Sequence, residues 1–570
     1  MAHSKSSKKR VFIGERNAAR NKSIKSRVKT FVKKVLTAVE AKNVDEAKAA
    51  LQVAYKELDK AVTKGVLKKN TASRKKSRLT LKVNALASLM VNVLNIVFPL
   101  ITNPYLTRIL SKSNYSYFNT ANTWASFVIP LAAFGIYNYG IRSISKVKDD
   151  KNKINYVFSK LFYISVVTSI AITALYFIFI SVGTHDTENL KILYYILGIQ
   201  ALFQFLNIEW MNEAYENYTF ILYKTLFIRI AMLVSIFSFV KTEDDIIPYA
   251  IIMSATTILN YLLSFLWIKR EVSFVKIDIK DLLTSTKALT TMLLLANANM
   301  LYTLLDRMFI TKSPDENYIS YYTIAFSIVM LIASVLSGAL NVSLPRLGYY
   351  LGRKDQDSYE YLIRQGASLF FFLMIPTSIG IMILGTYATV IYSSDKYLEA
   401  GIVTSIFAVR TIIWAIETIL GKQIIFINDF ESKLTSFYFI GGGLNVVLNS
   451  TLYFCNIFKP EYYIGTTILA EGLVVLLEIQ FIKKHKLINL SAVFSSLYKY
   501  LAVSLGFIPI YFITKFVFHI NSYEITLNML IMVCAVIAIC GIYYLVVLTI
   551  LKDSTINYAI NMVKNKIKKS

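Results

Sequence analysis

The chain has 570 residues, of which 55% are hydrophobic and 17% are charged. This composition excludes an ordinary soluble protein and is typical of a polytopic membrane protein. The formal net charge is +27, and roughly two thirds of it falls in residues 1–87, so we expect that part to meet a polyanion such as nucleic acid or an anionic membrane surface.

Few residues suggest catalysis or metal binding. The three cysteines, Cys455, Cys534 and Cys540, stand in apolar segments without a CxxC pair, so we expect reduced thiols. The four histidines are scattered, and no nucleophile–base set or nucleotide-binding loop is visible. The sequence therefore predicts no enzyme, no cofactor and no metal site, and the N-terminus does not read as a signal peptide.

Residues 1–85 predict a basic three-helix bundle. Apolar residues recur at helical spacing from Val28 to Val39, and Asn43 with Glu46 forms a capping box that opens a second helix. Gly65 stands where a C-terminal cap belongs, and a third helix carries Leu79 and Leu86. Short loops between three amphipathic helices are typical of an antiparallel bundle.

The bundle carries two clusters of cations without interleaved aromatic residues. Such clusters neutralise phosphates, and the missing stacking residues favour folded RNA over single strands. A solvated or lipid-facing basic surface is the alternative. The predicted RNA-binding residues are Lys5, Lys8, Lys9, Arg10, Arg16, Arg20, Lys22, Lys25, Arg27, Lys68, Lys69, Arg74, Lys75, Lys76 and Arg78.

Four stretches of this segment resemble a known family. They read SKKR, RNAARNKSIKSRVKTFVKKV, DKAVTKGVLKKNTASRKKSRLT and KVNALA. Together they resemble the bacterial small-ribosomal-subunit protein S-twenty over its full length. The resemblance implies direct binding to 16S ribosomal RNA in the small ribosomal subunit, through the basic residues of the first and third helices.

Residues 86–570 predict an all-helical membrane domain of about 14 spans. The expected ranges are 86–110, 117–138, 156–182, 189–207, 219–240, 246–268, 284–311, 318–343, 365–393, 401–427, 434–455, 462–482, 496–518 and 526–550. Lysines and arginines gather in alternate loops, for example Arg142 to Lys153 and Lys483 to Lys486. That side is expected to be cytoplasmic, so both termini should lie on the cytoplasmic side of the cytoplasmic membrane.

A weak internal repeat divides the spans into two lobes. Arg108 at the end of the first span matches Arg307 at the end of the seventh, and Arg142 matches Arg346 after the second and eighth spans. Six helices separate the equivalents, so two parallel six-helix lobes are predicted, at about 86–268 and 284–482, with two extra helices at about 496–550. A cleft between such lobes is typical of a transporter.

Ionisable residues inside spans are costly and usually face a cavity or a partner. Arg229 and Arg410 lie near mid-span, and Glu417 follows Arg410 by seven residues on the same face. The predicted substrate path is formed by Arg108, Arg142, Arg229, Asp306, Arg307, Arg346, Arg410 and Glu417. Cations outnumber acids in this set, which suits an anionic cargo such as a diphosphate. A packing pair between Arg410 and Glu417 and interfacial snorkelling of the four repeat arginines are the structural alternatives.

The membrane segment also resembles a known family. The residues that carry the resemblance are FPLITNPYLTRIL, AAFGIYNYGIRSISKVKDD, the IEW at Ile208–Trp210 and NVSLPRLGYYLGRKD. They resemble the Wzx-like flippases of the multidrug/oligosaccharidyl-lipid/polysaccharide superfamily. The resemblance implies translocation of undecaprenyl-diphosphate-linked oligosaccharide, with membrane lipid as a further partner. The glycine that the family often has after the first span is replaced around Ser113–Tyr115.

Three functions stay open at this point. The first is a fusion of an rRNA-binding domain with a lipid-linked oligosaccharide flippase. The second is a ribosomal protein with a passive membrane tail, and the third is a cation-coupled drug exporter, which the excess of arginine disfavours. Coupling to a proton or a sodium ion could involve Asp306, Glu417 or Glu471, and the sequence favours none of them.

Overall fold

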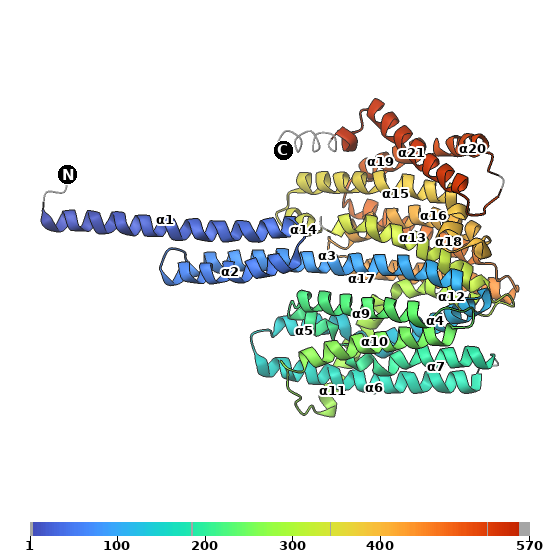
Figure 1. Cartoon of the computed structure of the whole chain (residues 1–570), viewed down its shortest axis with the longest axis horizontal. Coiled ribbons are helices and arrows are strands. Elements are labelled where there is room, and N and C mark those ends of the chain that lie inside the picture. The colour runs from blue at the N-terminus through green and yellow to red at the C-terminus, as the bar shows by residue number, and fades with distance from the viewer. Residues whose placement is uncertain (1–3, 184–185, 342–343, 521, 558–570) are drawn as a thin grey trace.

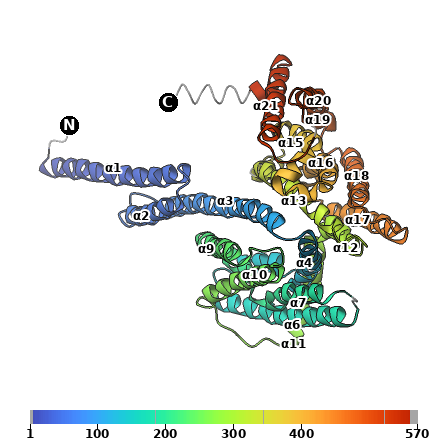
Figure 2. The same ribbon diagram turned by 45° about the vertical axis from the view of Figure 1, so that its right-hand side comes forward.

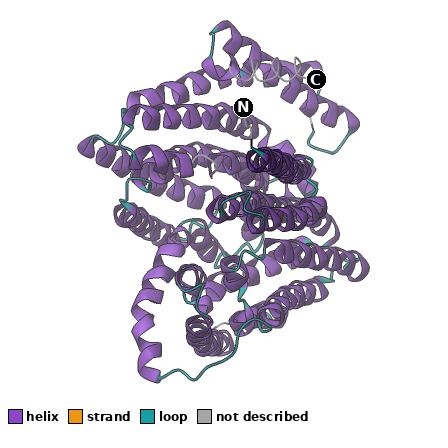
Figure 3. Ribbon diagram, turned by 90° about the vertical axis from the view of Figure 1, so that its left-hand side faces the viewer, coloured by secondary structure: helices purple, strands orange, loops and turns teal. Residues whose placement is uncertain are grey.

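The structure is a computed structural model that describes residues 4–183, 186–341, 344–520 and 522–557. Within these ranges the regular structure is helical and contains no strand (Figure 3). The prediction of an all-α protein is therefore confirmed. A narrow helical bundle projects from one end of a broad array of long helices that run roughly parallel to it (Figure 1).

The bundle consists of α1 (Lys5–Glu40), α2 (Val44–Thr63) and the first part of α3 (Lys69–Ile109). Its core contains Val28, Val35, Ala47, Ala54, Leu58, Ala61, Ala72, Leu79 and Val83. The capping box is formed: the Glu46 backbone N–H donates to Asn43 Oδ1 at 3.1 Å, and Asn43 Nδ2 donates to Glu46 Oε2 at 3.3 Å. Gly65 has a φ of +68°, the left-handed geometry that favours glycine after a helix.

The helix α3 differs from the prediction. The sequence suggests a third bundle helix followed by a separate first span, whereas α3 continues unbroken from Lys69 to Ile109 (Figure 2). No glycine or proline interrupts α3 where the bundle part passes into the first span. Its two prolines, Pro99 and Pro104, lie further along, within the span. The bundle is therefore joined to the membrane helices by a continuous helix.

The end of the bundle that faces the membrane helices also packs on α9 (Tyr218–Phe239). Val44, Leu86 and Ala87 bury their side chains with Leu222 of α9. The Tyr223 hydroxyl donates to the Asp45 carboxylate. These contacts fix the bundle against the membrane helices at a second place.

A first helix group follows α3 in the chain (Figure 1). It contains α4 (Lys112–Ala133), α5 (Ile136–Lys146), α6 (Lys151–Gly183), α7 (Glu188–Leu202), α8 (Glu209–Ala214), α9 and α10 (Ile246–Ile268). The helices α4, α6, α7 and α10 pack together around residues such as Tyr194, Leu197 and Tyr249.

A second helix group also combines long helices with short ones. It contains α12 (Thr303–Ile310), α13 (Tyr318–Asn341), α14 (Leu344–Gly352), α15 (Gln356–Tyr392), α16 (Ala400–Glu417), α17 (Glu431–Phe454) and α18 (Pro460–His485). The helices α19 (Leu490–Ser504), α20 (Phe507–Val517) and α21 (Leu527–Ile550) pack on the outside of α15. The two groups meet at the end far from the bundle, where Ser116 Oγ lies 2.8 Å from Ser320 Oγ.

Two predicted spans are broken. The expected span 284–311 consists of α11 (Ile279–Ala296), the short 3-10 helix η2 (Ala298–Leu301) and α12. Since α11 packs on α5 and α6 of the first group, while α12 packs on α13, α17 and α18 of the second group and also on α4 of the first, this span passes from one helix group to the place where the two groups meet. The expected span 496–518 is divided between α19 and α20.

Among the described residues, 12 helical segments are long and apolar enough to cross a membrane by length and composition. They correspond to predicted spans except that the broken seventh span and α17 are not among them. The chain therefore has a multi-pass membrane domain of long helices, with spans in largely the predicted places.

Candidate functional site

The predicted RNA-binding cations are displayed on the surface of the bundle. All of them whose side chains are described are exposed except Lys76, which is half-buried; Lys8 lies outside the side chains that the structure describes. Two of them pair with acids of α2: Arg27 Nη2 lies 2.5 Å from Glu57 Oε1, and Lys76 Nζ lies 2.6 Å from Asp59 Oδ2. The rest of the set leaves an extensive cationic surface free for a polyanion.

Arg410 pairs with a residue other than the one its spacing suggests. Its Nε donates to Glu471 Oε2 at 3.0 Å and its Nη2 donates to Glu471 Oε1 at 2.5 Å. This is a bidentate pair across α16 and α18, with both side chains largely buried. The suggested pair with Glu417 is therefore wrong, because side chains on one helix face compete with closer partners on the neighbouring helix.

Asp306 lies at the centre of a polar cluster in the second helix group. Its side chain is fully buried. Its Oδ1 accepts from Asn449 Nδ2 at 2.7 Å and from Asn445 Nδ2 at 3.0 Å. Its Oδ2 accepts from the Thr467 hydroxyl at 2.6 Å and the Tyr322 hydroxyl at 2.7 Å. Three helices, α13, α17 and α18, thus direct polar groups at one carboxylate that α12 carries.

Glu417 belongs to a different cluster. The Tyr438 hydroxyl of α17 donates to Glu417 Oε1. Glu478 of α18 lies beside them with a fully buried side chain. The cluster surrounds Gly421 in the π-helix η4 (Thr418–Ile425), where the chain continues from α16.

The four arginines of the predicted internal repeat lie on α3, α5, α12 and α14. Arg108 and Arg307 lie near the ends of α3 and α12, and each donates to a carbonyl four residues earlier, at 3.0 Å and 3.3 Å. Arg142 and Arg346 are exposed on the short helices α5 and α14. Arg108 also donates to the Ile391 carbonyl of α15 at 2.7 Å, which links α3 to the second group.

Arg229 stays within the first group, where its Nη2 donates to Asn95 Oδ1 of α3 at 3.3 Å. The sequence analysis missed a more deeply buried ion pair nearby. Lys224 Nζ lies 2.7 Å from Glu209 Oε2, and the Ser264 hydroxyl donates to the same carboxylate at 2.5 Å. The signal was available, because Lys224 interrupts an apolar run of α9 and Glu209 lies in the IEW motif.

The second helix group contains acids beyond those of the predicted path. In the second helix group, the interior carries the cations Arg307 and Arg410 and four acids, which are Asp306, Glu417, Glu471 and Glu478. Acids therefore outnumber cations among these described interior residues, and the predicted cation-rich path stays a prediction. Glu471 and Glu478 are the acids that the predicted path omits.

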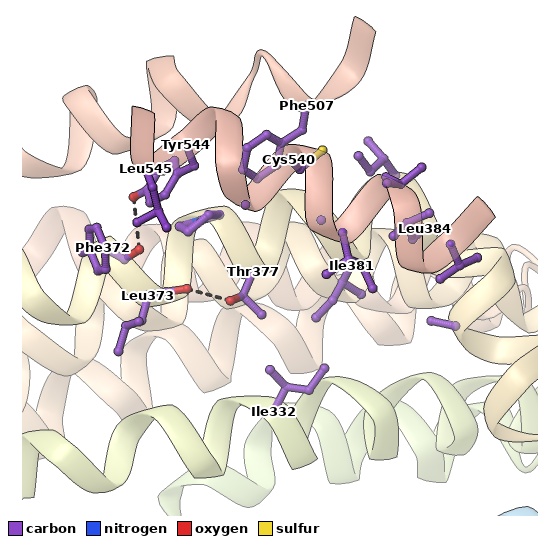
Figure 4. A pocket seen from close by; sticks show the side chains of 18 residues that line it. Ile332, Phe372, Leu373, Thr377, Ile381, Leu384, Phe507, Cys540, Tyr544 and Leu545 are labelled. Atoms are coloured by element: carbon purple, nitrogen blue, oxygen red, sulfur yellow. Dashed lines mark hydrogen bonds between the residues drawn. The ribbon is translucent and has the colours of Figure 1, made fainter. Parts of the chain in front are cut away.

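Two adjacent pockets follow α15. One has a volume of about 550 Å³ and is lined almost entirely by apolar residues of α15, α21 and their neighbours, such as Phe372, Ile381 and Leu545 (Figure 4). The other has a volume of about 660 Å³ and includes Arg364, Lys499 and several hydroxyl groups. Both contain Leu373 in their linings, so the two pockets adjoin along α15. We call them together the lateral groove, which is apolar at one end and holds Arg364 and Lys499 at the other.

Comparison with known proteins separates the two parts of the chain. Residues 2–84 match the family described as ribosomal protein S20. The chain is 65% identical over 88 residues to the small ribosomal subunit protein bS20 of Fusobacterium nucleatum, covering 98% of that protein and 15% of this chain. It is 54% identical over 86 residues to bS20 of Clostridium acetobutylicum, covering 98% of that protein and 15% of this chain.

Residues 81–350 match the family described as polysaccharide biosynthesis protein. Among solved structures, the chain is similar to the lipid II flippase MurJ in an inward closed conformation, with a TM-score of 0.63, 15% identity, and coverage of 82% of this chain and 99% of that one. It is also similar to an inward-facing multidrug resistance MATE transporter of the MOP superfamily, with a TM-score of 0.50, 14% identity, and coverage of 69% and 99%. The chain therefore belongs to the small ribosomal subunit protein bS20 family through its N-terminal residues, and it joins that ribosomal domain to a membrane domain that has the fold of the MurJ structure and matches the polysaccharide biosynthesis protein model over residues 81–350.

Proposed function

We propose that the chain is a fusion of two functional parts, residues 1–85 and residues 86–570. The first binds 16S rRNA as a small-subunit ribosomal protein. The second translocates undecaprenyl-diphosphate-linked oligosaccharide across the cytoplasmic membrane for polysaccharide or capsule export. Both termini are cytoplasmic in this proposal, which gives the basic bundle access to RNA.

The lateral groove along α15 is the observation that carries the transport proposal. A polyprenyl chain would fit the apolar end, because burial of apolar surface is favourable there and the lining offers few polar groups. The diphosphate would lie toward Arg364, which supplies positive charge at the other end, while the neighbouring Lys499 already pairs with the buried Asp553 carboxylate. A drug lacking a long apolar tail would have no need of such a groove.

Substitutions at two glycines test the groove. Gly380 and Gly541 both line the apolar pocket, and a Cβ at either position meets no atom within 4 Å. Tryptophan at either position should fill the groove without disturbing the fold and abolish restoration of surface polysaccharide in a strain that lacks its matched flippase. Gly443→Trp is the control, since Gly443 also has free space and lies on α17, away from the groove. Normal export with the groove filled would refute the proposal.

The RNA-binding proposal is tested with the full chain in detergent. We expect affinity for 16S rRNA to fall steeply as salt rises, because several phosphates are neutralised. The triple variant Lys68→Gln, Lys69→Gln and Lys75→Gln should weaken binding and flatten the salt dependence. The matched triple variant Lys48→Gln, Lys56→Gln and Lys60→Gln on α2 should bind like the parent chain. Equal losses in the two variants would leave only a nonspecific charge effect.

Asp306 is the residue at which we propose that a coupling proton or sodium ion binds. The Asp306 carboxylate supplies oxygen atoms that a hard cation prefers, and the Asn445 and Asn449 amides and the Thr467 hydroxyl, which donate to it here, would have to turn their oxygen atoms toward a bound cation. A buried carboxylate is also able to take up a proton in place of the cation. In proteoliposomes, Asp306→Asn should remove the dependence of transport on an ion gradient, and unchanged dependence would exclude this position.

A further inference from the structure

The glutamates Glu417 and Glu478 form a second buried acidic cluster that ion binding at Asp306 leaves unexplained. Glu478 is fully buried, and both of its carboxylate oxygens lack a hydrogen-bond partner among the described residues. A Cβ placed on Gly421 would lie 2.8 Å from Glu478 Oε1 and 3.2 Å from Glu417 Oε1. The two oxygens therefore lie within about 6 Å of each other, close enough for two negative charges to repel strongly in a buried site.

The two glutamates occupy the second of two matched positions between α16 and α18. Arg410 pairs with Glu471, and both Glu417 and Glu478 follow those residues by seven positions on the same two helices. Seven residues correspond to about two helical turns, or roughly 10 Å along the axis. The first pair is neutralised by opposite charges, whereas the second combines two acids.

The groups around the second pair do not neutralise it. The Tyr438 hydroxyl of α17 already donates to Glu417, and the Tyr302 hydroxyl donates to the backbone carbonyl of Tyr438 at 2.9 Å. Lys422 on the π-helix is exposed. Arg410 and Glu471 use their charges on each other. Glu478 therefore lies in the interior with no compensating cation.

We propose that Glu417 and Glu478 are a proton-binding site that holds α18 against α16. The proton resides on the Glu478 carboxyl, so that the pair carries one negative charge, which the Tyr438 hydroxyl stabilises on Glu417. Release of that proton to water leaves two neighbouring carboxylates, and their repulsion separates the two helices at this level. The Arg410–Glu471 pair stays intact, so the helices open from one end.

The local backbone is suited to this movement. The π-helix η4 begins directly after Glu417, and π-helical turns are frequent at functional sites because they relieve the regular hydrogen-bond pattern. Gly421 has no side chain where the two carboxylates approach, so its backbone leaves room for the protonated pair. The site does not depend on which substrate is transported.

The first test is infrared difference spectroscopy of the purified full chain during a pH titration. Because a protonated Asp306 would give a similar band, the titration is made in an Asp306→Asn background. There we expect the carbonyl stretch of a protonated, buried carboxylic acid, its loss on alkalinisation, and its complete absence when Glu478→Gln is added. The exposed α17 residue Glu431 provides the control, because Glu431→Gln should leave the band unchanged. A band that survives when Glu478→Gln is added, or no band in Asp306→Asn alone, would overturn the proposal.

A second variant keeps the test decisive if Glu478→Gln does not fold. Glu417→Gln removes the neighbouring negative charge. The band should therefore persist in this variant but titrate at lower pH than in the chain that retains Glu417. If the band titrates at the same pH in both proteins, Glu417 does not act on Glu478 and the proposal is wrong. If no band forms and the chain instead is stabilised by sodium chloride but not by choline chloride, with the effect lost in Glu478→Gln, the site binds a cation and the proton proposal is wrong.

The movement is tested with spin labels on two exposed residues, Phe426 beyond the π-helix and Leu476 on α18. In a cysteine-free background, the distance between labels at these positions should increase as the pH rises through the infrared titration. It should stay constant in Glu478→Gln. A distance that changes equally in both proteins would show that another group controls the helices.

Discussion

At the scale of single residues, the Arg410–Glu471 pair shows how a charge can be accommodated inside a membrane protein. Both guanidinium contacts use one carboxylate, so neither charge is left alone in the interior. Removing one partner of such a buried pair costs about 3–5 kcal/mol, whereas removing both is milder. The role of Arg410 in gripping a diphosphate stays a prediction, and it must now be tested against Glu471.

We therefore expect Arg410→Gln to lower the amount of folded protein in the membrane, because it leaves Glu471 buried without a cation. Arg410→Gln combined with Glu471→Gln should recover folded protein, and Arg410→Gln combined with Glu417→Gln should not. Quantitative membrane blots after detergent solubilisation measure the difference. Recovery by the Glu417 substitution would contradict the observed pairing. Export by the recovered double variant would show that Arg410 serves packing, and lost export would support a substrate contact.

At the scale of secondary-structure elements, α3 is the connection between the ribosomal bundle and the membrane helices. A helix advances 1.5 Å and turns 100° per residue, so its length fixes both the height and the rotation of the bundle. The contacts of Val44 and Asp45 with α9 require that rotation. The connection is therefore rigid rather than a flexible linker.

Inserting two alanines between Val83 and Asn84 should turn the bundle by about 200° relative to the spans. Cysteines at Asp45 and Tyr223 should crosslink in the parent frame and fail to crosslink after the insertion. Cysteines at Asn95 and Arg229, which contact each other at 3.3 Å beyond the insertion, should crosslink in both proteins. Persistent crosslinking between Asp45 and Tyr223 would show that the bundle is held by α9 and not by α3.

The elements also show what the sequence could and could not predict. Hydrophobic periodicity located the bundle core and nearly all spans, because burial and lipid exposure select apolar residues directly. It did not detect the break at η2 or the π-helix after Glu417, since an apolar segment has the same hydropathy whether its backbone is regular or broken. Partners on parallel helices, such as Arg410 and Glu471, are equally invisible to spacing along one helix.

At the scale of the whole molecule, the predicted topology places the bundle, and both termini, in the cytoplasm. Lys151 begins α6 at the bundle end, and Glu188 begins α7 at the far end. In a chain without its native cysteines, an impermeant thiol reagent should label Glu188→Cys from outside intact cells but not Lys151→Cys. Both should be labelled after the cells are opened. Labelling of Lys151→Cys alone in intact cells would reverse the orientation and the direction of transport.

The unbroken α3 has a consequence for the order of events during synthesis. Domains generally fold as they emerge, beginning at the N-terminus, but the helix that completes this bundle continues directly into the first span. Leu86 and Ala87 also contact Leu222 of α9, which emerges only after several further helices have left the ribosome. The ribosomal part therefore acquires its final position late, when the nascent chain is already in the membrane. Under the proposed RNA binding, a newly made copy would then meet ribosomal RNA at the membrane surface rather than in the bulk cytoplasm.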